Sequence, residues 1–403
     1  MPDLAISMNN HVQSFAKQDC QIHPCQHFGV CGGCSLRNHT YDQQCALKYQ
    51  HVCDVFAGIE HPSIPSVIPS PVIEYYRNKM EYACGVWDGM CAIGLRERKA
   101  YYHVIDLKHC FLQSETANQI LATVRTGAVR FNITGFHRKL HTGILRYVVI
   151  REGKNTGEIL VNCITTPVDH KHLAPLFSLI RSAHPEITSF IWSTTAEKND
   201  CAFGSKTSII WGTGLIKEKI NGLTFVIGPY SFFQTNTACV EKLYALLAQQ
   251  CMSGNYSVVL DLFCGSGGIA LSVADRAEKV IGIEHNPEAI QCACRNSQDN
   301  GITNCDFFHR DVNQLSWHEL IQDWDQTCVI LDPPRPGLGT KLKDMLMTKK
   351  PGYILYVSCN SRALMNDLQR MIQYYRITSI QPIDLFPHTP HYETVVALKK
   401  RRP

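Results

Sequence analysis

The sequence lacks the long apolar stretches that membrane spans require. No run approaches the ~18 apolar residues that cross a bilayer, and the residues after Met1 show no basic segment followed by an apolar one. A strong charge of either sign is also missing, because 39 Lys and Arg stand against 35 Asp and Glu, a net charge of +4. We therefore expect a cytoplasmic protein without membrane contact, and its charge permits an RNA partner without arguing for one.

Internal repeats, low-complexity segments and signs of an oligomer interface are missing as well, so we expect a monomer of two or three domains. Cysteine, in contrast, is plentiful, with 19 residues scattered along the chain. An odd number without a secretory signal indicates a reducing compartment rather than a disulfide framework. A few of these cysteines should therefore bind metal or take part in chemistry.

The pattern of the chain divides it into four parts. Residues 1–24 are polar and aperiodic, which predicts an N-terminal arm. Residues 25–71 hold a cysteine loop, a helix and a proline-rich linker. Short alternating strands over 72–225 predict a β-rich, α+β central domain. Residues 226–403 alternate strands with helices, which predicts a Rossmann-like α/β domain.

Two helices are expected before this last part. Residues 36–57 have helical periodicity without proline or glycine, and a second helical pattern, His172 to Ser182, interrupts the strands of the central part.

Cys25, Cys31 and Cys34 form a C-x5-C-x2-C cluster with two glycines between the last pair. Glycine permits the tight, open turns through which several thiolates can converge on one site. Three thiolates are one short of the ligand set of a structural zinc or a four-iron cluster, and the spacing leaves both open. Candidates for the fourth ligand are Cys84, Cys91 and Cys110.

Basic and aromatic residues are interleaved in the central part. Cations beside aromatic rings suit phosphate neutralisation together with base stacking, but solvated strand faces would give a similar pattern. The residues are Arg77, Lys79, Arg96, Arg98, Lys99, Arg138, Lys139 and Arg146, with Tyr75, Tyr76, Tyr101, Tyr102 and Phe136.

A glycine-rich turn follows the strand expected over 257–262, and a helix is expected over 269–277. Gly265 and Gly267 let the backbone approach a ligand closely. The next strand ends at Glu284, placed to accept hydrogen bonds from ribose hydroxyls.

Two acids favour an adenosyl sulfonium cofactor over a dinucleotide. Asp261 precedes the glycines, and a later strand ends in Asp332-Pro-Pro-Arg335, a turn typical of nucleic-acid methyltransferases. Enzymes that methylate amines usually carry an aromatic residue after the two prolines. Because Arg335 stands there, transfer to an exocyclic amine is disfavoured.

Cys359 lies between an apolar strand and a helix that Asn360 opens. The helix dipole and the free N–H groups at this position are expected to favour the thiolate. A thiolate that adds to C6 of uracil makes C5 nucleophilic, and a base must later remove the C5 proton. Glu393, at the start of the last strand, is the expected base, and His388 and His391 are the alternatives.

These segments together resemble the RNA 5-methyluridine methyltransferase family over residues 25–400. The motifs that carry the resemblance are Ser231-Phe-Phe-Gln234-Thr-Asn236, Asp261-Leu-Phe-Cys-Gly-Ser-Gly267, Asp332-Pro-Pro-Arg-Pro-Gly337, Ser358-Cys359-Asn360 and Phe386-Pro-His-Thr-Pro-His-Tyr-Glu393. The resemblance implies an S-adenosylmethionine-dependent RNA (uracil-C5)-methyltransferase with Cys359 as nucleophile and Glu393 as base. The residues expected to contact the cofactor are Gln234, Phe263, Gly265, Gly267, Glu284, Asp311 and Asp332.

The resemblance also bears on the cysteine cluster and on RNA binding. The rRNA branch of the family holds a [4Fe–4S] cluster through cysteines that match Cys25, Cys31, Cys34 and Cys110, which implies iron–sulfur, in a structural role, rather than zinc. Many members carry an OB-like TRAM domain before the first cysteine, and the arm is too short to form one. RNA binding is therefore expected to rest on the central domain.

The substrate that the resemblance implies is 23S rRNA, with the T-loop uridine of tRNA as the alternative. Two hypotheses from other classes stay open: a non-catalytic RNA-binding assembly factor and an NAD-dependent oxidoreductase.

Overall fold

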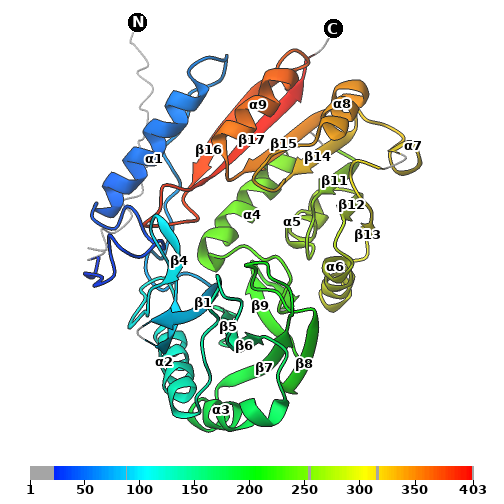
Figure 1. Cartoon of the computed structure of the whole chain (residues 1–403). Coiled ribbons are helices and arrows are strands. Elements are labelled where there is room, and N and C mark those ends of the chain that lie inside the picture. The colour runs from blue at the N-terminus through cyan, green and yellow to red at the C-terminus, as the bar shows by residue number, and fades with distance from the viewer. Residues whose placement is uncertain (1–21, 88, 253–255, 315–316, 402–403) are drawn as a thin grey trace, which may run out of the picture.

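A computed structural model describes residues 22–87, 89–252, 256–314 and 317–401. The predicted N-terminal arm lies almost wholly outside these residues. Within them, no helix combines the length and the apolar character that crossing a membrane would need. Two large sheets organise the described chain, one built from its middle and one from its C-terminal part (Figure 1).

The C-terminal sheet has seven strands in the order β13-β12-β11-β14-β15-β17-β16. Strands β11 to β15 are parallel to their neighbours, whereas β17 runs antiparallel between β15 and β16. The strands are β11 (Val258–Leu262), β12 (Lys279–Glu284), β13 (Cys305–His309), β14 (Thr327–Leu331), β15 (Tyr353–Ser358), β16 (Tyr375–Ile383) and β17 (Glu393–Lys400).

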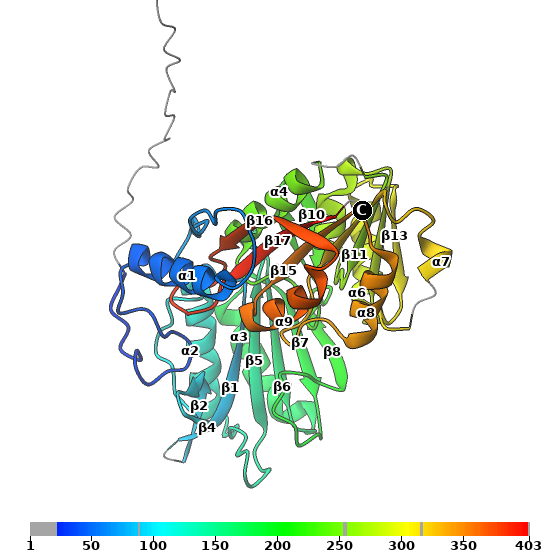
Figure 2. The same cartoon turned by 90° about the horizontal axis from the view of Figure 1, so that it is seen from above.

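Helices cover both faces of this sheet. Successive residues of a strand point to opposite faces, so each strand contributes apolar side chains to both layers of helices. One face, with Val259 and Leu355, packs against α4 and α5, and the other, with Leu260 and Ile354, packs against α1, α8 and α9. The helices are α1 (Tyr41–Phe56), α4 (Thr237–Cys251), α5 (Gly268–Ser272), α6 (Pro287–Asp299), α7 (Trp317–Leu320), α8 (Thr340–Lys349) and α9 (Ser361–Met371). The N-terminal helix α1 thus belongs to the C-terminal layer, as both views show (Figures 1 and 2).

The middle sheet has six strands in the order β2-β1-β5-β6-β7-β8. All neighbours are antiparallel except β6 and β7, which α3 (His170–Ala183) connects. The strands are β1 (Lys79–Trp87), β2 (Met90–Gly94), β5 (Leu145–Glu152), β6 (Ile159–Thr165), β7 (Ile187–Thr194) and β8 (Lys206–Trp211). Two further hairpins pair β3 (Arg96–Glu97) with β4 (Ala100–Val104), and β9 (Ile216–Ile220) with β10 (Leu223–Ile227).

The structure confirms α3 but corrects the number of helices in the central part. The helix α2 (Glu115–Arg130), not predicted, packs with α3 on one face of the six-stranded sheet. Its start could have been found from Ser114, whose side chain accepts a hydrogen bond from the Ala117 N–H as an N-cap does. The boundaries between the predicted domains stay predictions.

Two other predicted helices begin or end elsewhere. Helix α1 starts at Tyr41, because Thr40 and Gln43 form a capping box, and not at residue 36. Helix α5 ends at Ser272, and a 3-10 turn over Ala274–Arg276 replaces the rest of the helix predicted to residue 277.

Candidate active site

The seven-stranded sheet gathers most of the predicted site residues at one edge. Because β11, β12, β13, β14 and β15 are parallel neighbours, their carboxyl ends lie side by side. The residues at or just beyond these ends are Phe263, Glu284, Asp311, Asp332 and Cys359.

The loop after β11 makes a tight turn with the backbone close to open space. Phe263, Gly265 and Gly267 have positive φ angles of 70°, 53° and 85°. A Cβ atom added at Gly265 would meet no described atom within 4 Å, whereas one at Gly267 would come within 3.1 Å of the Phe307 ring. Gly265 therefore leaves room for a ligand against the backbone, and Gly267 is needed for packing.

Asp261 fixes this loop to its strand. Its side chain is fully buried, and Oδ2 accepts a hydrogen bond of 2.9 Å from the N–H of Ala270 in α5. Oδ1 has no hydrogen-bond partner in the described structure. Burial raises the pKa of Asp261 well above its usual range, and the charge of Asp332 adds to the effect. A buried carboxyl oxygen without a hydrogen-bond partner is unusual, and it leaves Asp261 able to take one further donor.

Gln234 and Asp332 come together although 98 residues separate them. The Gln234 Nε2 donates a hydrogen bond of 3.2 Å to Asp332 Oδ2. Burial raises the pKa of Asp332 to about 7, and the hydrogen bond from Gln234 opposes that rise. The amide and the carboxyl group thus form one polar wall beside the glycine loop.

Glu284 and Asp311 have carboxylates that already accept local hydrogen bonds. Glu284 accepts from the backbone N–H groups of His285 at 2.8 Å and Gly265 at 3.3 Å, which ties the end of β12 to the glycine loop. Asp311 accepts from the N–H of Asn313 at 2.9 Å, and this hydrogen bond is the main cause that lowers its pKa. Both acids are therefore held in fixed orientations at the sheet edge.

Cys359 and Glu393 lie next to each other because of the sheet register. Strand β17 is antiparallel to β15 and pairs Ser358 with Thr394, so Glu393 starts its strand beside the residue that ends β15. Glu393 is 3% exposed, and its Oε2 has no hydrogen-bond partner among the described residues. Burial raises the pKa of Glu393 well above its usual range, Asp332 raises it further, and Arg335 lowers it.

The pKa of the Cys359 thiol shifts in the direction opposite to the one expected from the sequence. Burial raises its pKa, the Glu393 carboxylate adds to the rise, and the Arg335 guanidinium opposes it. The Asn360 side chain accepts hydrogen bonds from the N–H groups of Arg362 and Ala363 at the start of α9, so these two donors already have a partner other than the thiol. The prediction that this position favours the thiolate is therefore wrong for the thiol in this environment.

The two histidines considered as alternative bases occupy different environments. His388 is fully buried, its Nδ1 lies 3.2 Å from the Gln44 side chain, and burial lowers its pKa to about 4. His391 is exposed and shares a cavity wall with Arg335. His388 therefore binds the N-terminal helix, whereas His391 faces solvent near the thiol.

The helix α1 holds the loop that leads to Glu393, a role that sequence reasoning missed. Lys48 and Asp384 form a fully buried ion pair with a Nζ–Oδ1 distance of 2.6 Å. Farther along, the Tyr392 hydroxyl lies 2.7 Å from His51 Nδ1 and 2.6 Å from Ser361 Oγ. Because Tyr392 precedes Glu393 and Ser361 follows Cys359 closely, these contacts join the surroundings of both residues.

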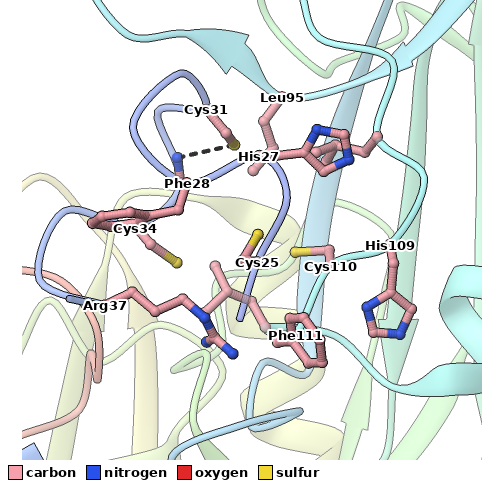
Figure 3. Close-up of a pocket in the computed structure, with 13 residues that line it drawn as sticks. Cys25, His27, Phe28, Cys31, Cys34, Arg37, Leu95, His109, Cys110 and Phe111 are labelled. Atoms are coloured by element: carbon pink, nitrogen blue, oxygen red, sulfur yellow. Dashed lines mark hydrogen bonds between the residues drawn. The ribbon is translucent and has the colours of Figure 1, made fainter. Parts of the chain in front are cut away.

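The four cysteines expected to bind a cluster line one pocket. Figure 3 shows the sulfur atoms of Cys25, Cys34 and Cys110 directed toward a common space, with Cys31 near its rim. The Cys31 sulfur accepts a hydrogen bond of 3.4 Å from the N–H of Gly33. The thiols come from two segments, residues 25–34 and the chain after β4, and Cys84 and Cys91 lie outside this pocket.

The chemistry of this donor set suits soft metals, but its geometry does not form a metal site. Burial raises the pKa of Cys34 to about 12 and that of Cys110 to about 11. Thiols bind metals only after they lose their proton. Within the described residues, no group of three or more His, Cys, Asp or Glu side chains could hold a metal ion. The predicted cluster is therefore not supported by the structure.

The sheet order, the glycine loop and the acids around it define the fold of an S-adenosylmethionine-dependent methyltransferase. A solved structure with the same arrangement is the tRNA (uracil-54, C5)-methyltransferase of Pyrococcus abyssi in complex with S-adenosyl-L-homocysteine. It is 31% identical, has a TM-score of 0.76 and covers 92% of this chain and 86% of its own.

Sequence comparisons agree with this assignment. The family described as tRNA (uracil-5-)-methyltransferase matches residues 204–401. An uncharacterized RNA methyltransferase of Nitratidesulfovibrio vulgaris is 36% identical over 94% of this chain and 82% of its own length. One from Leptospira interrogans is 32% identical over 93% of this chain and 98% of its own. The chain belongs to the family of S-adenosylmethionine-dependent RNA (uracil-5-)-methyltransferases, as the motifs predicted.

Proposed function

We propose that the protein methylates C5 of a uridine in RNA through a covalent adduct between Cys359 and C6 of the base. The observation that carries this proposal is that Cys359 lies close to Glu393, at the edge that also bears the glycine loop. The Glu393 carboxyl group is buried, and its Oε2 has no hydrogen-bond partner among the described residues. A nucleophile, a base and a donor site are the three parts that the chemistry requires.

Cys359 and Glu393 each act in one part of the proposed methyl transfer. The Cys359 sulfur, as thiolate, forms a bond to C6, and the electrons of the C5=C6 double bond move into an enolate. C5 then takes the electrophilic methyl group that S-adenosylmethionine supplies. Glu393 removes the C5 proton, the electrons of that C–H bond restore the C5=C6 double bond, and the S–C6 bond breaks to release the thiolate.

The polar wall and the glycine loop would hold the methyl donor. Gly265 leaves space beside its backbone, and Gln234 and Asp332 form a hydrogen-bonding wall next to it. Phe263, Gly267, Glu284 and Asp311 complete the set at the same sheet edge. Residues from four strand ends would thus converge on one ligand, as in other open α/β sheets.

We also propose that Cys25, Cys31, Cys34 and Cys110 hold a [4Fe–4S] cluster. Four thiols in one pocket match the ligand set of such a cluster. When bound, the cluster would cross-link two segments of the chain. The four thiols would have to lose their protons and move together, and a reducing cytoplasm suits that state.

The RNA that we propose as substrate is 23S rRNA, because the four cysteines match the rRNA branch of the family. tRNA is the second candidate, since the solved relative from Pyrococcus abyssi acts on uracil 54 of tRNA.

The test is methyl transfer from labelled S-adenosylmethionine to purified 23S rRNA and to bulk tRNA, with protein prepared without oxygen. Label at a uridine C5 in 23S rRNA supports the whole proposal, and label in tRNA alone favours the second candidate. No label in either RNA, together with intact RNA binding, would favour a non-catalytic assembly factor. Binding of NAD in place of S-adenosylmethionine in a calorimetric titration would favour the oxidoreductase hypothesis.

A further inference from the structure

A hairpin of the central part presents two tyrosines to solvent. Tyr101 and Tyr102 on β4 are 53% and 46% exposed, and their ring centroids lie 4.3 Å apart. The Tyr101 hydroxyl donates a hydrogen bond of 2.8 Å to the Tyr102 hydroxyl. Trp87, at the end of β1, is 51% exposed and belongs to the same cavity wall as Tyr102. Large aromatic rings at a monomer's surface mark an interaction site when they gather in one patch.

Cations lie directly over the two tyrosine rings. The Arg138 guanidinium carbon is 5.2 Å from the centre of the Tyr101 ring, and the Lys139 Nζ is 5.1 Å from that of Tyr102. Arg138 also pairs with Asp200 at 3.1 Å, which fixes its orientation, whereas Lys139 is exposed. We call Tyr101, Tyr102, Arg138 and Lys139 the tyrosine platform. Its combination of solvent-exposed rings and positive charge matches single-stranded nucleic acid, which offers stacking faces and phosphates together.

The platform lies at the end of a path from the candidate active site. One cavity of about 630 Å³ has Arg335 and His391 at its wall together with Arg77, Lys79 and Arg96. A second, of about 190 Å³, is lined by Arg96, Tyr102, Arg138 and Lys139. Arg96 lines both cavities, and its guanidinium pairs with Asp200 at 2.6 Å. Glu81 also lines the first cavity and pairs there with Lys79 at 2.5 Å. Cations that phosphates could contact thus line both cavities, with Arg335 in the first and the tyrosine platform in the second.

The cysteine loop holds the hairpin that carries the platform. The N–H of Gly32 donates a hydrogen bond of 2.9 Å to the carbonyl of Arg96, and the N–H of Arg98 donates one of 2.7 Å to the carbonyl of Val30. In Figure 2, β4 lies beside β1 and β2 at one end of the six-stranded sheet. The platform is therefore supported on two sides and does not depend on β3 and β4 alone.

We propose that the tyrosine platform binds an unpaired nucleotide of the substrate RNA that flanks the methylated uridine. The base stacks on Tyr102, and the adjoining phosphates contact Lys139 and Arg138. This inference rests on the proposed function, in which RNA reaches Cys359, and it goes further by assigning a second contact point away from the reacting base. It also defines the substrate class, because only a loop or unpaired strand can offer a free base face.

The test measures the dissociation constant of a fluorescent single-stranded oligouridine of 12 nucleotides by anisotropy. Tyr102→Ala should weaken binding roughly tenfold, the order found when one stacking aromatic is removed, and Tyr102→Phe should bind like the wild type because it keeps the ring. Lys139→Ala should reduce the slope of log affinity against log salt by about one. Matched controls are Phe203→Ala and Lys171→Ala, which remove an exposed aromatic residue from the loop between β7 and β8 and an exposed cation from α3.

The outcomes separate this inference from the proposed function. Weaker binding of the oligouridine in Tyr102→Ala, with unchanged S-adenosylmethionine binding, supports the platform. Unchanged affinity in Tyr102→Ala, or an equal loss in Phe203→Ala, would overturn it while methyl transfer by the wild type still stands. A wild type that binds a duplex of the same length as tightly as the single strand would also contradict it.

Discussion

Cys359 and the four cysteines of the N-terminal pocket present the same side chain in two different settings. Cys359 follows β15, whose register the seven-stranded sheet fixes, and the same register brings Glu393 beside it. The pocket cysteines lie in loops, where only a few hydrogen bonds, such as that from the Cys110 N–H to Asn118 Oδ1, set their positions. The fold therefore positions the proposed nucleophile by itself, whereas the four thiols would need the proposed cluster to draw them together.

Burial raises the thiol pKa at both sites, but the neighbouring charges differ. At Cys359 the Glu393 carboxylate adds to the rise and Arg335 opposes it. At Cys34 the neighbouring thiol of Cys110 adds to the rise and Arg37 opposes it. A carboxyl group is thus among the causes that shift the pKa of Cys359, whereas the charges that shift the pKa of Cys34 belong to other thiols and to one guanidinium. This difference fits the proposed roles, proton transfer at the first site and ligand binding at the second.

The largest expected effect is that of Cys359→Ala. Removal of the sulfur leaves nothing to add to C6, so methyl transfer should fall to background, a loss of at least about 10³-fold. S-adenosylmethionine binding, measured by calorimetry, should stay unchanged, because the glycine loop does not involve this thiol. Cys201→Ser, at an exposed cysteine, serves as the control, and turnover retained in Cys359→Ala would refute the adduct.

The second-largest expected effect is that of Cys34→Ser in the four-cysteine pocket. Cys34→Ser should lose the bound iron and acid-labile sulfide of anaerobically prepared protein and lower its melting temperature. The binding free energy of a structural metal becomes folding free energy, about 10–16 kcal/mol for zinc sites. Iron content and thermal unfolding measure both changes, again with Cys201→Ser as the control. If purified wild-type protein binds no iron under reducing conditions, the cluster proposal fails.

A smaller effect is expected from breaking the buried ion pair of Lys48 and Asp384, which joins α1 to the loop before Glu393. Lys48→Met leaves the Asp384 carboxyl group buried without its partner, which should lower the free energy of unfolding by about 3–5 kcal/mol. The double variant with Asp384→Leu should recover most of that loss, since an apolar pair of similar volume needs no charge. Urea unfolding of the single and double variants gives the comparison, and equal stability of all three proteins would contradict the assigned role.

The smallest expected effect is a shift in the pH dependence of kcat/KM. Because burial and Glu393 raise the pKa of Cys359, the thiolate fraction, and with it kcat/KM, should rise about tenfold per pH unit below that pKa. Arg335→Met removes the charge that lowers the pKa, so the profile should move to higher pH, and a shift of one unit would reduce the rate at pH 7 about tenfold. Arg362→Met, at an exposed cation of α9, should leave the midpoint unchanged. A profile that stays in place in Arg335→Met would refute this coupling.

The sequence alone predicted the strands that follow from local residue patterns. Apolar strands bounded by glycine or by helix caps predicted β11, β12 and β15, and with them the edge where Cys359 and Glu284 lie. The resemblance supplied the family, which the comparisons confirmed.

The missed features depend on contacts between distant residues. Lys48 and Asp384 are 336 residues apart, and nothing near either one in the sequence indicates an ion pair. The thiol pKa of Cys359 also depends on the fold, because it follows from burial and from the charges of Glu393 and Arg335, which other segments of the chain bring close. Helix α2 was missed for a different reason, since its cap at Ser114 was a readable local signal.

The central claim is covalent catalysis by Cys359 with Glu393 as the base. The most direct measurement is mass spectrometry of Glu393→Gln after incubation with S-adenosylmethionine and substrate RNA. Addition and methyl transfer should still occur while elimination stalls, so we expect a denaturation-resistant adduct whose mass corresponds to methylated uridine on the Cys359 peptide. Absence of the adduct in Glu393→Gln, with RNA and donor both bound, or an adduct on another residue, would contradict it.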